Sequence, residues 1–236
     1  GDALVSALTA QLLHSYVLVR PLTKMGDHLS GARMLIRVAK HISKFPMHIV
    51  PILTSTVIEC HRAGLRNSAF DFATTLMRPE YRSQIGDAYK RKIEAIVRKP
   101  GERNDLDEPE TPSPFDPKAM TPETHLECPS TRNTLPYCIA TGRHVVLNDL
   151  TLCPSCSFPA LFSEFTKMIE SESQCPMCQQ EVNLSAVRKM EESEASDWLH
   201  GATKKENAGR RWGDAGLSAA VKGGGMGSLM NSLKGK

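Results

Sequence analysis

The chain has 236 residues, an apolar fraction of 40% and a net charge of +3, enough for two modest domains that each bury a core. No apolar run approaches the roughly 20 residues of a membrane span, and the first residues lack the basic start and cleavage site of a signal peptide. We therefore expect no membrane span and no secretion. The chain opens at Gly1 inside an apolar-periodic stretch, so we expect a fragment of a longer protein.

The charge is unevenly distributed. Residues 1–100 carry 15 Lys/Arg and 7 Asp/Glu, whereas residues 101–127 carry 2 and 8. A basic half is typical of some nucleic-acid binders, but a solvated helical face is the favoured explanation. We expect no direct nucleic-acid partner.

Apolar spacing predicts that residues 1–99 are helical throughout. Pro21 is expected to end the first helix, Asp27 to cap the second, and Gly64 to close the third. The five expected helices cover about residues 2–19, 27–41, 48–63, 65–77 and 80–97.

Two pairs of small residues, Gly31-Ala32 and Ser68-Ala69, lie 37 positions apart. This is close to the period of about 34 residues in tetratricopeptide-type (TPR) repeats. Small residues at these places let the two helices of a hairpin approach closely. We predict a TPR-like helical-hairpin solenoid end over residues 1–99, with an irregular all-α domain as the alternative.

Two segments have compositions that disfavour packed structure. Residues 100–127 are rich in proline and acidic residues, so we expect that neither helix nor strand propagates there. The segment is either an extended linker or the collapsed remnant of a segment that was once better ordered. Residues 189–236 mix charge with glycine, including Gly223-Gly224-Gly225, and are expected to be a disordered, low-complexity tail. The apolar patches 217–221 and 229–233 are the alternative, because they are suited to dock on a partner.

Residues 128–188 are predicted to form a small α+β zinc-binding domain of zinc-ribbon or RING-like type. Two Cys-Pro-x-Cys turns, Cys153/Cys156 and Cys175/Cys178, are separated by 18 residues, which fits the spacing of paired zinc ligands. The cluster has no secretory context, so metal is favoured over disulfides. Four thiolates fill a tetrahedral shell and leave no position for water or substrate. We therefore predict one structural zinc ion and no catalytic residues.

A second zinc ion through Cys138 and His144 is a weaker alternative. These residues are expected on a β-ribbon with a turn at Gly142, where a buried cysteine and a hydrogen-bonded histidine are the favoured explanation. Cys128 and His125 are the only further candidate ligands nearby. After Pro159, apolar residues at helical spacing predict an amphipathic helix over the zinc core.

Several segments of the sequence resemble a known family. Five features closely resemble the C-terminal portion of a WD-repeat subunit of intraflagellar transport complex A: Gly31–Met47, His48–Asp71, Met77–Gly86, Leu135–Val145 and the two Cys-Pro-x-Cys turns. The resemblance covers about residues 14–182. It implies two propellers and a longer helical solenoid ahead of this segment, other complex A subunits as partners in a large hetero-oligomer, and a location in the cilium or flagellum, its basal body and the cytoplasm.

The resemblance also implies a second pair of zinc-binding turns upstream. Three of the four cysteines expected there are replaced, by Ser113, Asp116 and Thr131, and Cys128 stays alone. We predict that this second site has been lost.

Three functional classes follow. A non-enzymatic scaffold or adaptor that supports retrograde ciliary transport is favoured, because helical hairpins present long surfaces to partners. A RING-like ubiquitin-ligase module is the enzymatic alternative, but it needs eight interleaved ligands. A zinc-ribbon nucleic-acid binder is disfavoured by the near-neutral charge around the turns.

Overall fold

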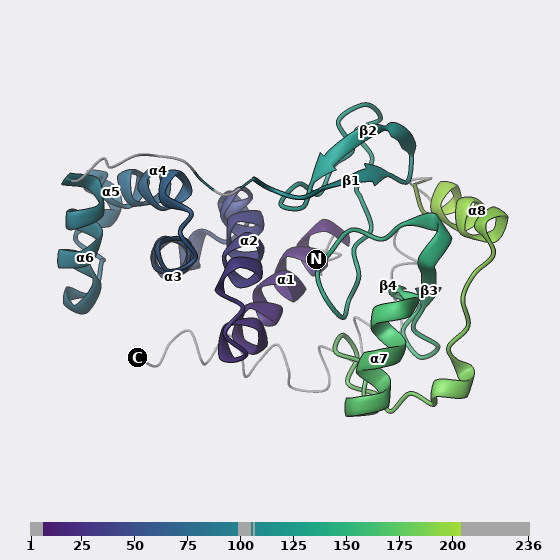
Figure 1. The fold of residues 1–236 in the computed structure, drawn as a ribbon. Coiled ribbons are helices and arrows are strands. Elements are labelled where there is room, and N and C mark those ends of the chain that lie inside the picture. Colours follow the sequence, from purple (N-terminus) through teal and green to yellow (C-terminus); the bar gives the residue numbers. More distant parts are fainter. Residues whose placement is uncertain (1–6, 99–104, 106, 204–236) are drawn as a thin grey trace, which may run out of the picture. The chain divides into compact units, whose positions relative to one another are not determined.

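The computed structural model describes residues 7–98, 105 and 107–203, and in this part the chain forms eight α-helices and two small antiparallel sheets (Figure 1). It divides into two compact units. The helical unit consists of residues 15–108, and the cysteine unit consists of residues 1–14 together with residues 109–236. The prediction of a mainly α chain with a small sheet-containing cysteine region is confirmed, whereas the TPR-like character of the helices stays a prediction.

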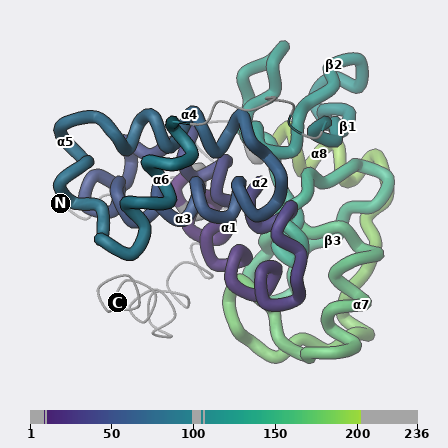
Figure 2. The backbone as a smooth tube through the Cα atoms, turned by 60° about the vertical axis from the view of Figure 1, so that its left-hand side comes forward, coloured from purple at the N-terminus to yellow at the C-terminus, as the bar shows by residue number. Residues whose placement is uncertain are grey.

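The helical unit contains most of α1 and all of the next five helices. Their bounds are α1 Ala7–Lys24, α2 His28–Ala39, α3 Ile49–Arg62, α4 Arg66–Leu76, α5 Pro79–Arg82 and α6 Asp87–Arg98. Helix α3 packs against both α2 and α4, and all three are seen in Figure 2. None of the helices in the described residues is long and apolar enough to cross a bilayer.

Two of the predicted helix boundaries are formed by the expected residues. The Asp27 carboxylate accepts a hydrogen bond of 3.0 Å from the Ser30 amide and caps α2. Gly64 has a φ of +81°, and the Leu65 amide reaches back to the Cys60 carbonyl at 2.9 Å after α3. This positive φ favours glycine, so the helix ends there.

Gly31 lies where α2 crosses α1. A Cβ atom added at Gly31 would lie 2.9 Å from Cγ2 of Thr23. The missing side chain therefore allows the close approach that the sequence predicted for this small residue. The apolar core of the unit lies between the helices, with Ala39, Val50, Leu53, Val57, Ala73, Leu76, Ile85 and Ile93 in one cluster.

Two helix predictions are wrong. Helix α1 continues through Pro21 to Lys24, because a proline removes only one hydrogen bond and its own carbonyl still accepts from the Met25 amide at 3.1 Å. The single helix expected over 80–97 is interrupted between Arg82 and Asp87 and becomes α5 and α6. The break leaves Ile85 and Ile93 both buried in the same core cluster.

The proline-rich segment, in which neither helix nor strand was expected, contains a β-hairpin. Strands β1 (Glu110–Ser113) and β2 (Asp116–Pro122) pair antiparallel, with Glu110 opposite Pro122 and Pro112 opposite Met120. A strand in a two-stranded hairpin has one partner only, so the proline nitrogen, which has no hydrogen to donate, can face outward without the loss of a ladder hydrogen bond. Proline therefore did not prevent strand formation here.

The cysteine unit also contains β3 Leu150–Leu152, β4 Pro159–Leu161, α7 Phe162–Glu172 and α8 Glu192–Thr203. Strands β3 and β4 pair antiparallel with Leu150 opposite Leu161. The start of α1 belongs to this unit too, since the Tyr137 hydroxyl donates to the Gln11 carbonyl at 3.1 Å.

Helix α8 corrects the predicted start of the tail at residue 189. Ala195, Trp198 and Leu199 are buried in the core of the cysteine unit, which gives this charged, low-complexity segment enough apolar burial to form a helix. The rest of the predicted tail, with the patches at 217–221 and 229–233, lies outside the described residues. The units also begin and end at other residues than the predicted boundaries at 99/100, 127/128 and 188/189.

Candidate metal centre

Each Cys-Pro-x-Cys sequence folds into the same tight turn. In the first turn the Cys153 amide donates to the Phe158 carbonyl at 2.9 Å, and the Ser157 amide donates to the Cys153 carbonyl at 2.8 Å. In the second turn Cys175 forms the equivalent bonds with Gln180 and Gln179 at 3.0 and 2.8 Å. Ser157 and Gln179 both have a φ of 59°. These left-handed residues reverse the chain directly after the second cysteine of each turn.

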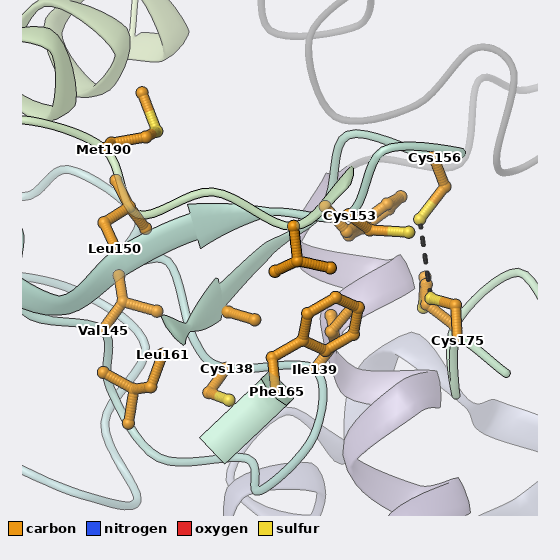
Figure 3. Close-up of a cluster of buried hydrophobic side chains, with 14 of the residues drawn as sticks. Cys138, Ile139, Val145, Leu150, Cys153, Cys156, Leu161, Phe165, Cys175 and Met190 are labelled. Carbon is orange, nitrogen blue, oxygen red and sulfur yellow. Dashed lines mark hydrogen bonds between the residues drawn. The ribbon is translucent and has the colours of Figure 1, made fainter. Parts of the chain in front are cut away.

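The two turns bring four sulfur atoms together. The Sγ atoms of Cys153, Cys156, Cys175 and Cys178 all lie within 4.8 Å of one another, and all four side chains are buried. The Sγ atoms of Cys156 and Cys175 are 3.8 Å apart (Figure 3). A tetrahedral zinc site with bonds of about 2.3 Å places its sulfurs about 3.8 Å apart. The donor set and its spacing therefore fit a zinc ion.

The electrostatics of the cluster favour a bound cation. Hydrogen bonds from Cys156 and Cys175 lower the pKa of Cys153, and amide groups of Cys156 and Ser155 act in the same direction. The hydrogen bond between Cys156 and Cys153 raises the pKa of Cys156. The hydrogen bond between Cys175 and Cys153 is the main cause of the raised pKa of Cys175. Sulfurs this close cannot all ionise without a compensating positive charge. A divalent cation supplies that charge and displaces the protons.

The cluster is fixed to the core of the unit through α7 and the β3–β4 pair. Phe165 on α7 is fully buried beside Ile139, and both side chains lie under the cysteine turns (Figure 3). Strand β3 leads into Cys153, and α7 lies between the second and third cysteines of the set. Metal binding at the turns is therefore linked to packing of the core.

Cys138 and His144 do not belong to the four-sulfur cluster. Cys138 is buried in the apolar core, and Nε2 of His144 donates to the His125 carbonyl at 2.6 Å. Tyr137 and His144 form an isolated β-bridge in place of the expected ribbon of two strands. Among the described residues, no metal-ligating group of three or more includes either side chain.

Two further turns have the same geometry, one at Cys128, where the resemblance implies a degenerate zinc-binding turn, and one at Cys138, where a turn was predicted at Gly142. The Cys128 amide donates to Asn133 and the Cys138 amide to Arg143, at 2.9 and 2.7 Å. The residues that reverse the chain are Arg132 and Gly142, with φ of 58° and 75°. A threonine occupies the place of the second cysteine in each turn. A cysteine followed by a threonine three residues later is therefore the sequence pattern that these two turns share.

The positions of the predicted lost site lie close together. The Ser113 hydroxyl donates to Sγ of Cys128 at 3.1 Å, and Ser130 lies 3.3 Å from the same sulfur. Burial raises the pKa of Cys128, but hydrogen bonds from Ser113, Ser130 and Thr131 outweigh it and lower the pKa to about 6. Asp116 accepts a hydrogen bond from the Lys118 amide within its own strand.

Cys60 is the cysteine of the helical unit. It is fully buried, and burial, followed by the charges of Asp105 and Glu59, raises its pKa to about 12. A protonated thiol in an apolar setting is unreactive, so Cys60 is an inert core cysteine.

The comparisons with known proteins agree with the site and with the predicted resemblance. A family model described as "IFT121, second zinc finger domain" matches residues 136–183, which include all four clustered cysteines. WD repeat-containing protein 19 of Mus musculus and that of Homo sapiens are each 58% identical over 184 residues, or 78% of this chain. WD repeat-containing protein dyf-2 of Caenorhabditis elegans is 46% identical over 166 residues, or 70% of the chain.

The aligned part is a small share of each relative. It makes up 14% of the mouse and human proteins and 12% of the worm protein. The chain is therefore related, over 78% of its residues, to a segment of WD repeat-containing protein 19 that makes up 14% of that protein.

Proposed function

We propose that this chain is a non-enzymatic scaffold segment of intraflagellar transport complex A, which supports retrograde transport in cilia through contacts with other subunits. The observation that carries the proposal is the buried four-sulfur cluster, in a chain 58% identical to part of WD repeat-containing protein 19. We place the protein in the cilium or flagellum, at its basal body and in the cytoplasm.

Cys153, Cys156, Cys175 and Cys178 are the proposed ligands of one structural zinc ion. Four thiolates complete its coordination, so the ion supplies folding free energy and does not activate water. The protein surface around the ion then provides the partner-binding function. The turn at Cys138–Arg143 and helix α7 belong to the same packed core as the cluster, and zinc holds them as one rigid surface for a partner.

The RING-like ligase alternative gains no support. A cross-brace requires two interleaved sets of four ligands, and the described residues bring one set of four together. Cys138 and His144 were candidates for the second set. Cys138 is buried in the apolar core, and His144 hydrogen-bonds to a backbone carbonyl.

The test uses full-length protein in ciliated cells that lack the native copy. We expect Cys153→Ser/Cys156→Ser to reduce co-precipitation of the other complex A subunits and to cause retrograde cargo to accumulate at ciliary tips. Arg143→Glu is the companion variant, because Arg143 is exposed on a turn of the cysteine unit. It is expected to weaken partner binding while zinc content stays unchanged. Normal assembly and normal cilia in the cysteine variant, at matched protein levels, would contradict the proposal.

A further inference from the structure

Helix α4 lacks a polar N-cap of its own. Its N-cap residue is Leu65, whose side chain cannot accept a hydrogen bond from the first amides of the helix. Helices normally place Ser, Thr, Asp or Asn at this position because those amides have no partner within the helix.

A distant carboxylate takes that role. Asp105, which lies 38 residues after Asn67 in the chain, accepts hydrogen bonds from the Asn67 amide at 2.6 Å and from the Ser68 amide at 3.0 Å. Its second oxygen also accepts from the Ser68 hydroxyl at 2.8 Å. The three bonds reproduce the pattern of a capping aspartate, and the carboxylate lies at the positive end of the helix dipole.

The residues after Asp105 contact a second helix. The Asp107 carbonyl accepts from the Arg33 guanidinium on α2 at 3.2 Å. Burial lowers the pKa of Lys40, directly after α2, and the nearby charge of Glu108 opposes that change. This acidic segment thus interacts with two helices of the helical unit.

We propose that Asp105, Asp107 and Glu108 form a clasp, an acidic segment that folds back onto the helical unit and supplies the N-cap that α4 lacks. The clasp joins the start of α4 to α2 through residues that follow both helices in the chain. It also fixes the point at which the chain leaves the helical unit, in a segment that composition alone predicts to be a free linker. The inference does not depend on zinc or on ciliary transport.

Amide hydrogen exchange in the complete chain tests the clasp. Asp105→Ala is expected to speed exchange of the Asn67 and Ser68 amides about fivefold, the factor that corresponds to a typical cap of about 1 kcal/mol. Asp107→Ala is the matched control. It removes a carboxylate two residues away from Asp105. Asp107 contacts Arg33 through its backbone carbonyl, which alanine keeps, so exchange at Asn67 and Ser68 should not change.

A second variant separates loss of the clasp from a general loss of stability. Ser68→Asp places a carboxylate beside that of Asp105, so repulsion should release the clasp and speed exchange at Asn67 by a similar factor. Combining Ser68→Asp with Asp105→Ala removes the repulsion and gives α4 a new carboxylate in its first turn, so exchange at Asn67 should slow again relative to Ser68→Asp alone. Unchanged exchange in Asp105→Ala, or equal acceleration in the Asp107→Ala control, would overturn the proposal.

Discussion

Replacing Cys175 with serine is expected to unfold the cysteine unit while the helical unit stays folded. The binding of structural zinc contributes roughly 10–16 kcal/mol that is also folding free energy, which is comparable to the roughly 5–15 kcal/mol stability of a whole domain. The core of the cysteine unit packs directly on the four cysteines, so it cannot persist once the metal is lost. The helical unit has separate apolar clusters.

Limited proteolysis with mass spectrometry of the fragments measures this outcome. A fragment that covers the helical unit should survive, and residues after about 109 should be digested. Cys60→Ser is the matched control, since it makes the same chemical change at a buried cysteine outside the cluster. It should leave zinc content and the cysteine unit unchanged. Digestion of both units together in Cys175→Ser would show that they do not fold independently.

Replacing Phe165 with alanine is expected to lower the free energy of unfolding of the cysteine unit by about 3–5 kcal/mol. Such a loss combines the transfer free energy of a buried aromatic ring with the cost of the remaining cavity. Phe165 is fully buried on α7 within the same cluster as the cysteines, so few neighbours can move to fill the space.

Urea denaturation of the zinc-loaded protein measures that change. Lys167→Ala, on the exposed face of the same helix, is the control. Lys167 pairs with Glu164 at 3.5 Å on the surface, and such pairs are worth at most about 1 kcal/mol. If Phe165→Ala and Lys167→Ala had equal effects, α7 would not be part of the core that supports the cluster.

The features predicted well from sequence are those with local causes. The Cys-Pro-x-Cys turns are set by a few neighbouring residues, and the structure brings their four sulfurs together as the spacing predicted. Asp27 and Gly64 likewise act within one helical turn of their own positions. The Gly31 contact also followed from a local pattern, because small residues mark close helix crossings.

The features that were missed depend on distant parts of the chain. Helix α8 forms in a low-complexity context because Trp198 and Leu199 pack into a core made by other segments. The β1–β2 hairpin forms in a proline-rich segment because each strand needs a single partner. The composition around Asp105 predicts a linker residue, whereas in the structure its carboxylate accepts hydrogen bonds from the first turn of α4. The residue pattern of one segment carries no information about partners that lie far away in the chain.

Zinc stoichiometry tests the central claim most directly. Native mass spectrometry of the purified protein, supported by elemental analysis, should give one zinc ion per chain, and none in Cys153→Ser/Cys156→Ser. That result follows from one four-sulfur cluster and from the replacement of three cysteines at Ser113, Asp116 and Thr131. Two ions per chain would show that Cys128, Cys138 and His144 are ligands after all, and a wild-type protein that carries no zinc would contradict the account of the site.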